Sequence, residues 1–251
     1  MTATLPDSLS AVLPAYNEEA VIATTIRRTA TALSRTGVAS HEVVVVDDGS
    51  VDGTRAACDR IARTLGGIRV VGHSSNRGYG AALRSGFGAA TGQAIFLMDS
   101  DGQFDPGEIE RLLPHWDGST MVCGYRAHRS DPALRGIYNA AFFSLVHARF
   151  GSLARDINCG FKLFPAAAGR GLSVDGALIS TELLLRGREL GFGVADVEVT
   201  HLPRSTGSPT GARPAVVIRA FAELWRMHRA DRRSGAAASA PAASPSGPAG
   251  G

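Results

Sequence analysis

Short apolar runs alternate with longer stretches of mixed polarity along most of the chain. Uninterrupted runs of this length are typical of strands that are buried on both faces of a parallel sheet. They begin near Ser10, Glu42, Ile68, Ala94 and Thr120. The mixed stretches predict helices over about 18–36, 53–65, 79–90, 106–114, 133–150, 180–190 and 213–229. Strands that alternate with helices indicate right-handed crossovers, and hence an α/β fold with a mostly parallel, Rossmann-like sheet flanked by helices.

Polar loops follow four of the predicted strands and carry most of the candidate chemistry. These loops are 14–19, 47–54, 76–84 and 99–103. Because the carboxyl ends of parallel strands lie at one edge of a sheet, we expect the four loops to line a common ligand crevice.

The fourth loop contains Asp99 and Asp101, two acids that are separated by one residue at the end of a buried strand. Such a pair can hold a hard divalent cation against a diphosphate, which is what a nucleotide-sugar transferase requires. Asp, Ser and Gly are also ordinary turn residues. A turn without catalytic function therefore remains an alternative at this point.

Composition divides the chain into two parts. The apolar fraction of 44% and the charged fraction of 20% are those of an ordinary globular protein. From residue 230 onward Ala, Ser, Pro and Gly dominate, and such a segment cannot bury enough apolar surface to offset its ordering entropy. We expect one folded domain over 1–229 and a disordered tail over 230–251.

The sequence predicts a cytoplasmic protein. No run approaches the ~18 to 20 apolar residues of a membrane span, and residues 1–9 lack the pattern of a signal peptide. Cys58, Cys123 and Cys159 are widely spaced, which favours reduced thiols over disulfides or a zinc site.

The positive charge is carried almost wholly by arginine, since Lys162 is the only lysine and the net charge is +3. The arginines are scattered over several predicted helices rather than gathered in a stripe with aromatic residues, which argues against nucleic-acid binding. Diphosphates and anionic lipid headgroups suit arginine better, because the planar guanidinium matches phosphate geometry.

Six blocks of sequence, taken in order, together resemble one family. They are Pro14–Glu18, Val46–Ser50, Asn76–Arg84, Met98–Gln103, Gly160–Phe164 and His201–Arg204. Over residues 8–229 these blocks are similar to the successive motifs of the family-2 inverting glycosyltransferases with the GT-A fold. Within that family they most resemble the polyprenyl-phosphate branch, which includes dolichol-phosphate and undecaprenyl-phosphate sugar transferases.

The resemblance implies a nucleotide-sugar donor, linked to GDP or UDP, in the crevice. Pro14, Tyr16 and Glu18 would frame the nucleotide, and Asp48 would accept a hydrogen bond from the base ring. Glu18 is also suited to a helix start, and both roles can hold together. Asp52 is better explained as a local cap on the following helix.

Asn76 and Gly78 belong to a loop ahead of a helix, where glycines let backbone N–H groups approach a phosphate. The same glycines could instead only permit tight packing. By resemblance, Asp101 and Gln103 coordinate Mg²⁺ or Mn²⁺ together with the diphosphate, and Asp99 holds the ribose or shapes the metal loop. Oxygen ligands of this kind suit either cation.

The acceptor half contains arginines at positions where the polyprenyl-phosphate branch binds the acceptor phosphate. By resemblance these are Arg126 and Arg135, while Arg204 belongs to a loop that closes over donor and metal. Each could also be a solvated surface residue. Glu182 matches an acidic position of the family, where it would act as a base for a hydroxyl acceptor or only complement a helix dipole.

Two features depart from the polyprenyl-phosphate branch. The Ser-Lys pair usual after the closing-loop arginine is absent after Arg204, and no membrane helix follows the catalytic domain. The predicted helix 214–229 is amphipathic and basic, so it could lie at a membrane surface or pack on the domain. A lipid acceptor would then be met peripherally, at the inner face of the membrane.

The sequence thus predicts a metal-dependent, inverting transferase that moves a sugar from a nucleotide diphosphate to a polyprenyl phosphate. One alternative is the same fold acting on a soluble hydroxyl acceptor, with Glu182 as base. A second is a catalytically silent module that binds a nucleotide sugar or a membrane surface.

Overall fold

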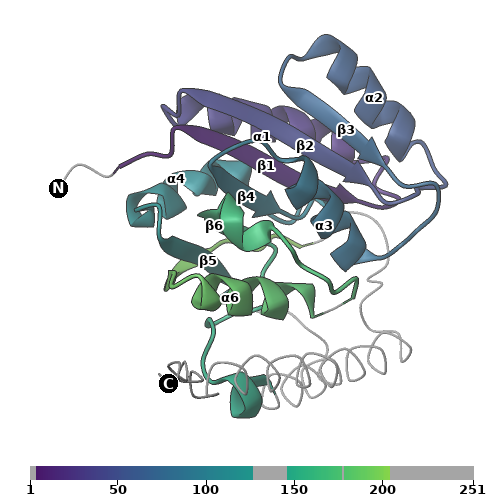
Figure 1. The fold of residues 1–251 in the computed structure, drawn as a ribbon. Helices are drawn as coiled ribbons and strands as arrows, with labels where there is room; N and C mark the ends of the chain where they lie inside the picture. Colours follow the sequence, from purple (N-terminus) through teal and green to yellow (C-terminus); the bar gives the residue numbers. More distant parts are fainter. Residues whose placement is uncertain (1–3, 127–145, 177, 204–251) are drawn as a thin grey trace, which may run out of the picture.

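The computed structural model describes residues 4–126, 146–176 and 178–203. These residues form a fold built on one seven-stranded sheet (Figure 1). Its strands are β1 (Ser8–Ala15), β2 (Ser40–Asp47), β3 (Ile68–Gly72), β4 (Ala94–Met98), β5 (Thr120–Arg126), β6 (Phe161–Pro165) and β7 (Gly193–Val199). They lie in the order β3-β2-β1-β4-β6-β5-β7.

All of these strands except β6 run in one direction. β1 pairs in parallel with β2 and β4, β2 with β3, and β5 with β7, while β6 lies antiparallel between β4 and β5. The predicted mostly parallel sheet is therefore confirmed. One edge of it collects the carboxyl ends of six strands and the amino end of β6.

Helices cover both faces of the sheet (Figure 1). One apolar core lies between the sheet and α1 (Ile22–Arg35), α2 (Thr54–Thr64) and α4 (Ile109–Leu112). The other lies between the sheet and α3 (Tyr79–Ala89) and α6 (Ile179–Glu189). Alternate side chains of each central strand enter opposite cores, which explains why their sequences read as continuous apolar runs.

Several predicted boundaries differ from the structure. The predicted helix 106–114 consists of α4 between two short 3₁₀ turns, η1 (Pro106–Glu108) and η2 (Leu113–His115). Strands β6 and β7 were not predicted. Of the predicted helix 133–150, only 146–150 is described and is helical. The predicted helix 213–229 and the tail 230–251 lie outside the described residues.

Among the described residues, no helix is long and apolar enough to cross a membrane.

Candidate active site

The predicted donor residues gather at one edge of the sheet. The last residues of β1 and the residues after β1, β2, β3 and β4 supply them, because each of these parallel strands ends at that edge. The set comprises Pro14, Tyr16, Glu18, Asp48, Asn76, Gly78, Asp99, Asp101 and Gln103. The convergence of four loops, which the sequence predicted, is therefore confirmed as a feature of the fold.

The first two loops are bound to each other by hydrogen bonds that each join a backbone N–H to a side-chain oxygen. Asn17, at the left-handed φ of 56°, accepts from Val51 N at 3.0 Å and donates its own N–H to the Ser50 hydroxyl at 3.0 Å. The N–H of Glu18 donates to Thr54 Oγ1 at 2.8 Å. These bonds hold the loop that carries Tyr16 and Glu18 against the start of α2.

The local roles expected for two acids are also visible. Asp52 accepts from the backbone N–H of Thr54 at 3.0 Å, as expected for an acid at the start of a helix. The carbonyl of Glu18 accepts from Val21 and Ile22 N–H, at the first turn of α1. Helix α1 thus begins later than predicted, and Glu18 lies in the turn that leads into it.

Asp48 is 3% exposed and organises the third loop. Its Oδ1 accepts from Arg77 N at 2.9 Å and its Oδ2 from Gly78 N at 2.8 Å. The Nδ1 atom of His73 lies 2.6 Å from Oδ1. A carboxylate offers about four lone pairs, so one on Oδ2 remains for the nucleobase contact, which stays a prediction.

The glycines of this loop lie against protein backbone. Gly78 has a φ of 98°, a conformation that favours glycine, and a Cβ on Gly80 would overlap the main chain of Asp175. Tight packing, one of the two expectations from the sequence, therefore accounts for Gly80. That backbone N–H groups of this loop approach a phosphate stays a prediction.

Asp99 directly follows β4, and its carboxylate lies between two neighbours. Tyr79 donates its hydroxyl to Oδ1 at 2.8 Å, and the α-carbon of Gly160 lies against Oδ2. Burial and the nearby charge of Asp101 raise the pKa of Asp99 to about 6, although the Tyr79 hydrogen bond opposes the rise. A cation or a ligand hydroxyl near this carboxylate would stabilise its charged form.

The predicted metal ligands lie in the turn after Asp99. Asp101 accepts from Gln103 N at 3.1 Å, and Gln103 Nε2 donates to the carbonyl of Leu202 at 3.0 Å. Oε1 is then the atom of Gln103 that can ligate a cation. His201, next to Leu202, packs edge-on against Phe104, with 5.1 Å between the ring centroids.

This donor set fits Mg²⁺ or Mn²⁺ only when a substrate completes the shell. The described residues contain no group of three His, Cys, Asp or Glu side chains that could hold a metal by themselves. Mg²⁺ is usually bound by one or two carboxylates together with substrate phosphates and water. Asp101 and Gln103 are therefore suited to a cation that arrives with a diphosphate.

Arg126, at the end of β5, forms a bidentate ion pair with Asp156. Nε lies 2.8 Å from Oδ2, and the second bond, from Nη2 to Oδ1, is 3.2 Å long. Both side chains are largely buried, at 16% and 7% exposed. If Arg126 also binds an acceptor phosphate, as predicted, its guanidinium has to contact that phosphate and the Asp156 carboxylate together. Arg135 and Arg204, the other predicted acceptor arginines, lie outside the described residues.

Glu182 lies in the first turn of α6 and holds a neighbouring loop. Its carboxylate accepts from the N–H groups of Ser173 and Val174 at 2.9 Å and from the Ser173 hydroxyl at 2.6 Å. Its carboxylate is thus engaged in local structure, and its predicted role as a base stays a prediction.

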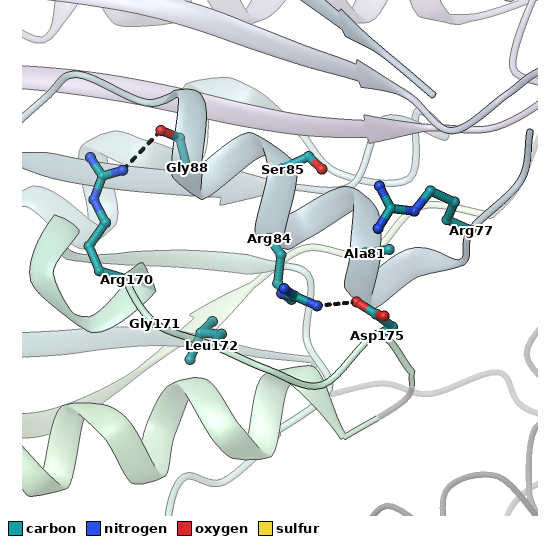
Figure 2. Close-up of a pocket in the computed structure, with 10 residues that line it drawn as sticks. Arg77, Ala81, Arg84, Ser85, Gly88, Arg170, Gly171, Leu172 and Asp175 are labelled. Carbon is teal, nitrogen blue, oxygen red and sulfur yellow. Dashed lines mark hydrogen bonds and ion pairs between the residues drawn. The ribbon is translucent and has the colours of Figure 1, made fainter. Parts of the chain in front are cut away.

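Two cavities flank the loop between β3 and α3. The first, of about 430 Å³, is lined by residues of the donor loops that include Tyr16, His73 and Asn76. The second, of about 440 Å³, lies on α3 and is surrounded by arginines from different segments, Arg77 and Arg170 among them (Figure 2). Of the donor residues predicted from sequence, Tyr16 and Asn76 line the first cavity.

Three contributors to the site were absent from the sequence prediction: His73, Tyr79 and Gly160. Tyr79 and Gly160 lie inside two of the six sequence blocks that resemble the family, so the sequence could have identified them as site residues. His73 directly follows a strand end, but nothing local marks its contact with Asp48, which lies 25 residues earlier.

Residues 10–171 match the family described as glycosyl transferase family 2. Glycosyltransferase AglD of Haloferax volcanii is 35% identical over 208 residues, which cover 78% of this chain and 33% of that protein. Dolichyl-phosphate beta-glucosyltransferase of Drosophila melanogaster is 30% identical over 214 residues, which cover 76% of this chain and 66% of that protein.

A third relative is the undecaprenyl-phosphate 4-deoxy-4-formamido-L-arabinose transferase of Klebsiella pneumoniae, 32% identical over 159 residues that cover 62% of this chain and 48% of that protein. The chain thus spans between a third and two thirds of the length of these relatives.

Among solved structures, glucosyl-3-phosphoglycerate synthase from Mycobacterium tuberculosis in complex with UDP has a TM-score of 0.68 and 22% identity, covering 88% of this chain and 80% of that one. The same enzyme has been crystallised with Mn²⁺ and with Mg²⁺. At this identity the likeness shows a shared GT-A fold. The family match over most of the domain, together with relatives at 30% identity or more, shows that this chain belongs to glycosyl transferase family 2.

Proposed function

We propose that this protein transfers a sugar from a nucleotide diphosphate to a polyprenyl phosphate, with a divalent cation and with inversion at the anomeric carbon. The observation that carries the proposal is that relatives at 30% identity or more are named for dolichyl or undecaprenyl phosphate. The loops at the carboxyl edge of the sheet support it, because they provide acids where a diphosphate would lie.

The chemistry follows from the groups at that edge. An oxygen of the acceptor phosphate would attack the anomeric carbon from the face opposite the diphosphate, and the bond from that carbon to the diphosphate oxygen would break. Asp101 and Gln103 would hold the diphosphate through the cation, and Asp99 would orient the ribose or the metal loop. A bound Mg²⁺ or Mn²⁺ would offset the charge that develops on the departing diphosphate.

No general base is needed for such an acceptor, because a phosphate monoester is already anionic near neutral pH. The engagement of Glu182 by Ser173 and Val174 supports this reading over a hydroxyl acceptor. The acceptor would instead require cationic partners, for which Arg126, Arg135 and Arg204 are the candidates. With a lipid acceptor the enzyme would work peripherally at the inner membrane surface.

A transfer assay tests the proposal directly. The protein is incubated with Mn²⁺ and labelled UDP-glucose or GDP-mannose, and with either a polyprenyl phosphate in detergent or soluble 3-phosphoglycerate. We expect labelled lipid from one of the two donors. Label on the soluble acceptor without any on the lipid would overturn the acceptor assignment.

A further inference from the structure

A buried chain of hydrogen bonds joins Asp48 to His73 and to Ser85. The Nδ1 atom of His73 lies 2.6 Å from Asp48 Oδ1, and its Nε2 atom lies 2.8 Å from Ser85 Oγ. The His73 side chain is only 5% exposed and that of Asp48 only 4%. The three residues come from the end of β2, the end of β3 and the middle of α3, so the chain ties three elements together.

The donor and acceptor roles along this chain follow from its end groups. A carboxylate can only accept hydrogen bonds, so Nδ1 of His73 donates to Asp48. The Ser85 hydroxyl can donate or accept, so it can bond to Nε2 of the ring. Both ring nitrogens of His73 are therefore hydrogen-bonded.

The order of these groups is that of a Ser-His-Asp triad, but the position of Ser85 inside a helix argues against that chemistry. Ser85 lies inside α3, where backbone N–H groups are bound to carbonyls one turn earlier. Helix α3 itself therefore offers no pair of free N–H groups beside Ser85 for an oxyanion. Ser85 acts instead as a fixed point on a helix, and it borders the arginine-lined cavity on α3 (Figure 2).

Asp48 links this chain to the loop between β3 and α3. Its carboxylate accepts from Arg77 N at 2.9 Å and from Gly78 N at 2.8 Å, next to the left-handed φ of Gly78. A carboxylate that rotates about its Cβ–Cγ bond would lose one or both of these bonds. The His73 ring opposes that rotation because it is held at both nitrogens.

We propose that His73 is a positioning residue of the donor site: anchored by Ser85, it holds the Asp48 carboxylate in the orientation that fixes the Arg77–Gly78 backbone for the nucleotide. This inference rests on the proposed function for its nucleotide, but the order of the loop can be measured without one. His73 also lines the first cavity, that of the donor loops, so a substitution of His73 also alters the wall of that cavity.

Two substitutions of His73 test the hydrogen bonds of its two ring nitrogens one at a time. An Asn side chain places an N–H donor near the position of Nδ1, so His73→Asn keeps the bond to Asp48 and loses the one to Ser85. A Gln side chain reaches the position of Nε2, so His73→Gln keeps the bond to Ser85 and loses the one to Asp48. His115→Gln is the matched control, because His115 is exposed in η2, outside the described site.

The first measurement is amide hydrogen exchange at Arg77 and Gly78 by NMR. We expect exchange at both amides to become at least tenfold faster in His73→Gln and to change less than threefold in His73→Asn and in His115→Gln. Equal acceleration in both His73 variants, or in neither, would overturn the proposal.

The second measurement is the affinity for UDP and GDP with Mn²⁺ by calorimetry, with the melting temperature of each variant. We expect affinity to fall more than tenfold in His73→Gln and less than threefold in His73→Asn, at similar melting temperatures. Affinity losses that only follow the melting temperatures would reduce His73 to a structural residue. If the unmodified protein binds neither nucleotide, the proposed function fails, while the exchange data still decide whether His73 orders the loop.

Discussion

The carboxylate of Asp99 lies directly against the α-carbon of Gly160, where β6 begins. A Cβ at residue 160 would overlap both carboxylate oxygens, and the N–H of Asp99 donates to the Gly160 carbonyl at 3.0 Å. Glycine is required here because of a neighbouring side chain, since the φ of Gly160 is not in the left-handed region. The antiparallel strand β6 thus helps to shape the donor site from the opposite direction.

Gly160→Ala should displace Asp99 without unfolding the protein. Because the added methyl group meets a partly exposed side chain, Asp99 can rotate away, and we expect turnover to fall at least about tenfold, or ~1.4 kcal/mol. The melting temperature should change by only a few degrees. Gly66→Ala, where a Cβ meets nothing within 4 Å, is the matched control. Unchanged turnover in Gly160→Ala would show that the position of Asp99 is not critical.

Asp101→Ala should remove the metal dependence of nucleotide binding. If Asp101 and Gln103 hold a cation that bridges to the diphosphate, Mn²⁺ should tighten UDP or GDP binding to the unmodified protein, and EDTA should reverse it. In Asp101→Ala, calorimetry should give the same weak affinity with and without Mn²⁺. A variant that still responds to Mn²⁺ would exclude Asp101 as the main ligand.

The first residues of β1 and the loop before β4 are joined through Glu42 in a way that should make stability depend on pH. Glu42 Oε1 accepts from Ser10 Oγ at 2.7 Å and from Thr91 N at 2.8 Å. Burial raises the pKa of Glu42, but the hydrogen bonds from Thr91 and Ser10 outweigh it and lower the pKa below the ordinary 4.5. A lowered pKa in the folded state stabilises the protein above pH 4.5, and this contribution is lost as the pH falls through the folded value.

Glu42→Gln should therefore cost stability at pH 7, by about 1–2 kcal/mol, and much less in acid. Urea unfolding at pH 7 and near pH 3.5, compared between variant and unmodified protein, measures the difference. A cost that stays constant between the two pH values would mean that the charge of Glu42 contributes nothing.

The sequence predicted β1, β2 and β4 well because burial on both faces leaves an unbroken apolar run. It did not predict β6, in which Lys162 interrupts the run, because the place of β6 between β4 and β5 depends on pairing with distant strands. It also did not predict β7, an edge strand whose residues are largely exposed.

The same distinction applies to the site. That Asp48, Asp99 and Asp101 lie at one edge followed from strand order alone. Which donors reach a carboxylate did not, because the partners of Asp48 and Arg126 are 25 to 30 residues away in the chain. Local motifs therefore identified the residues of the site, and tertiary contacts determined what each of them does.

Glu182→Gln should affect stability more than turnover. The carboxylate accepts from Ser173 and Val174 N–H, and an amide can replace only one of its two oxygens as an acceptor. We expect a loss of ~1–2 kcal/mol in unfolding free energy and a change in kcat of less than about threefold. A loss of kcat by a hundredfold or more, with a shifted pH profile, would instead support the base role and a hydroxyl acceptor.

Lys162, the only lysine, is fully buried in β6. Its ammonium donates to the carbonyl of Ile157 at 3.0 Å and to that of Cys159, and both carbonyls lie in the segment that leads to Gly160. Lys162→Met would leave these two carbonyls without their donor, each at about 1–3 kcal/mol, and would loosen the support of Asp99. We expect reduced stability and reduced turnover together, measured by urea unfolding and a transfer assay.

Amine labelling tests the burial of Lys162 independently of any activity. Because the side chain is 0% exposed and both carbonyls hold its amino group, an amine-reactive ester should leave Lys162 unmodified in the folded protein. Mass spectrometry of peptides that contain residues 157–165 should find the label only after denaturation. The amino terminus, if unblocked, provides an internal control for the reagent under both conditions. Rapid labelling of Lys162 in the folded protein would show that β6 opens to solvent, and the support that it gives Asp99 would then be transient.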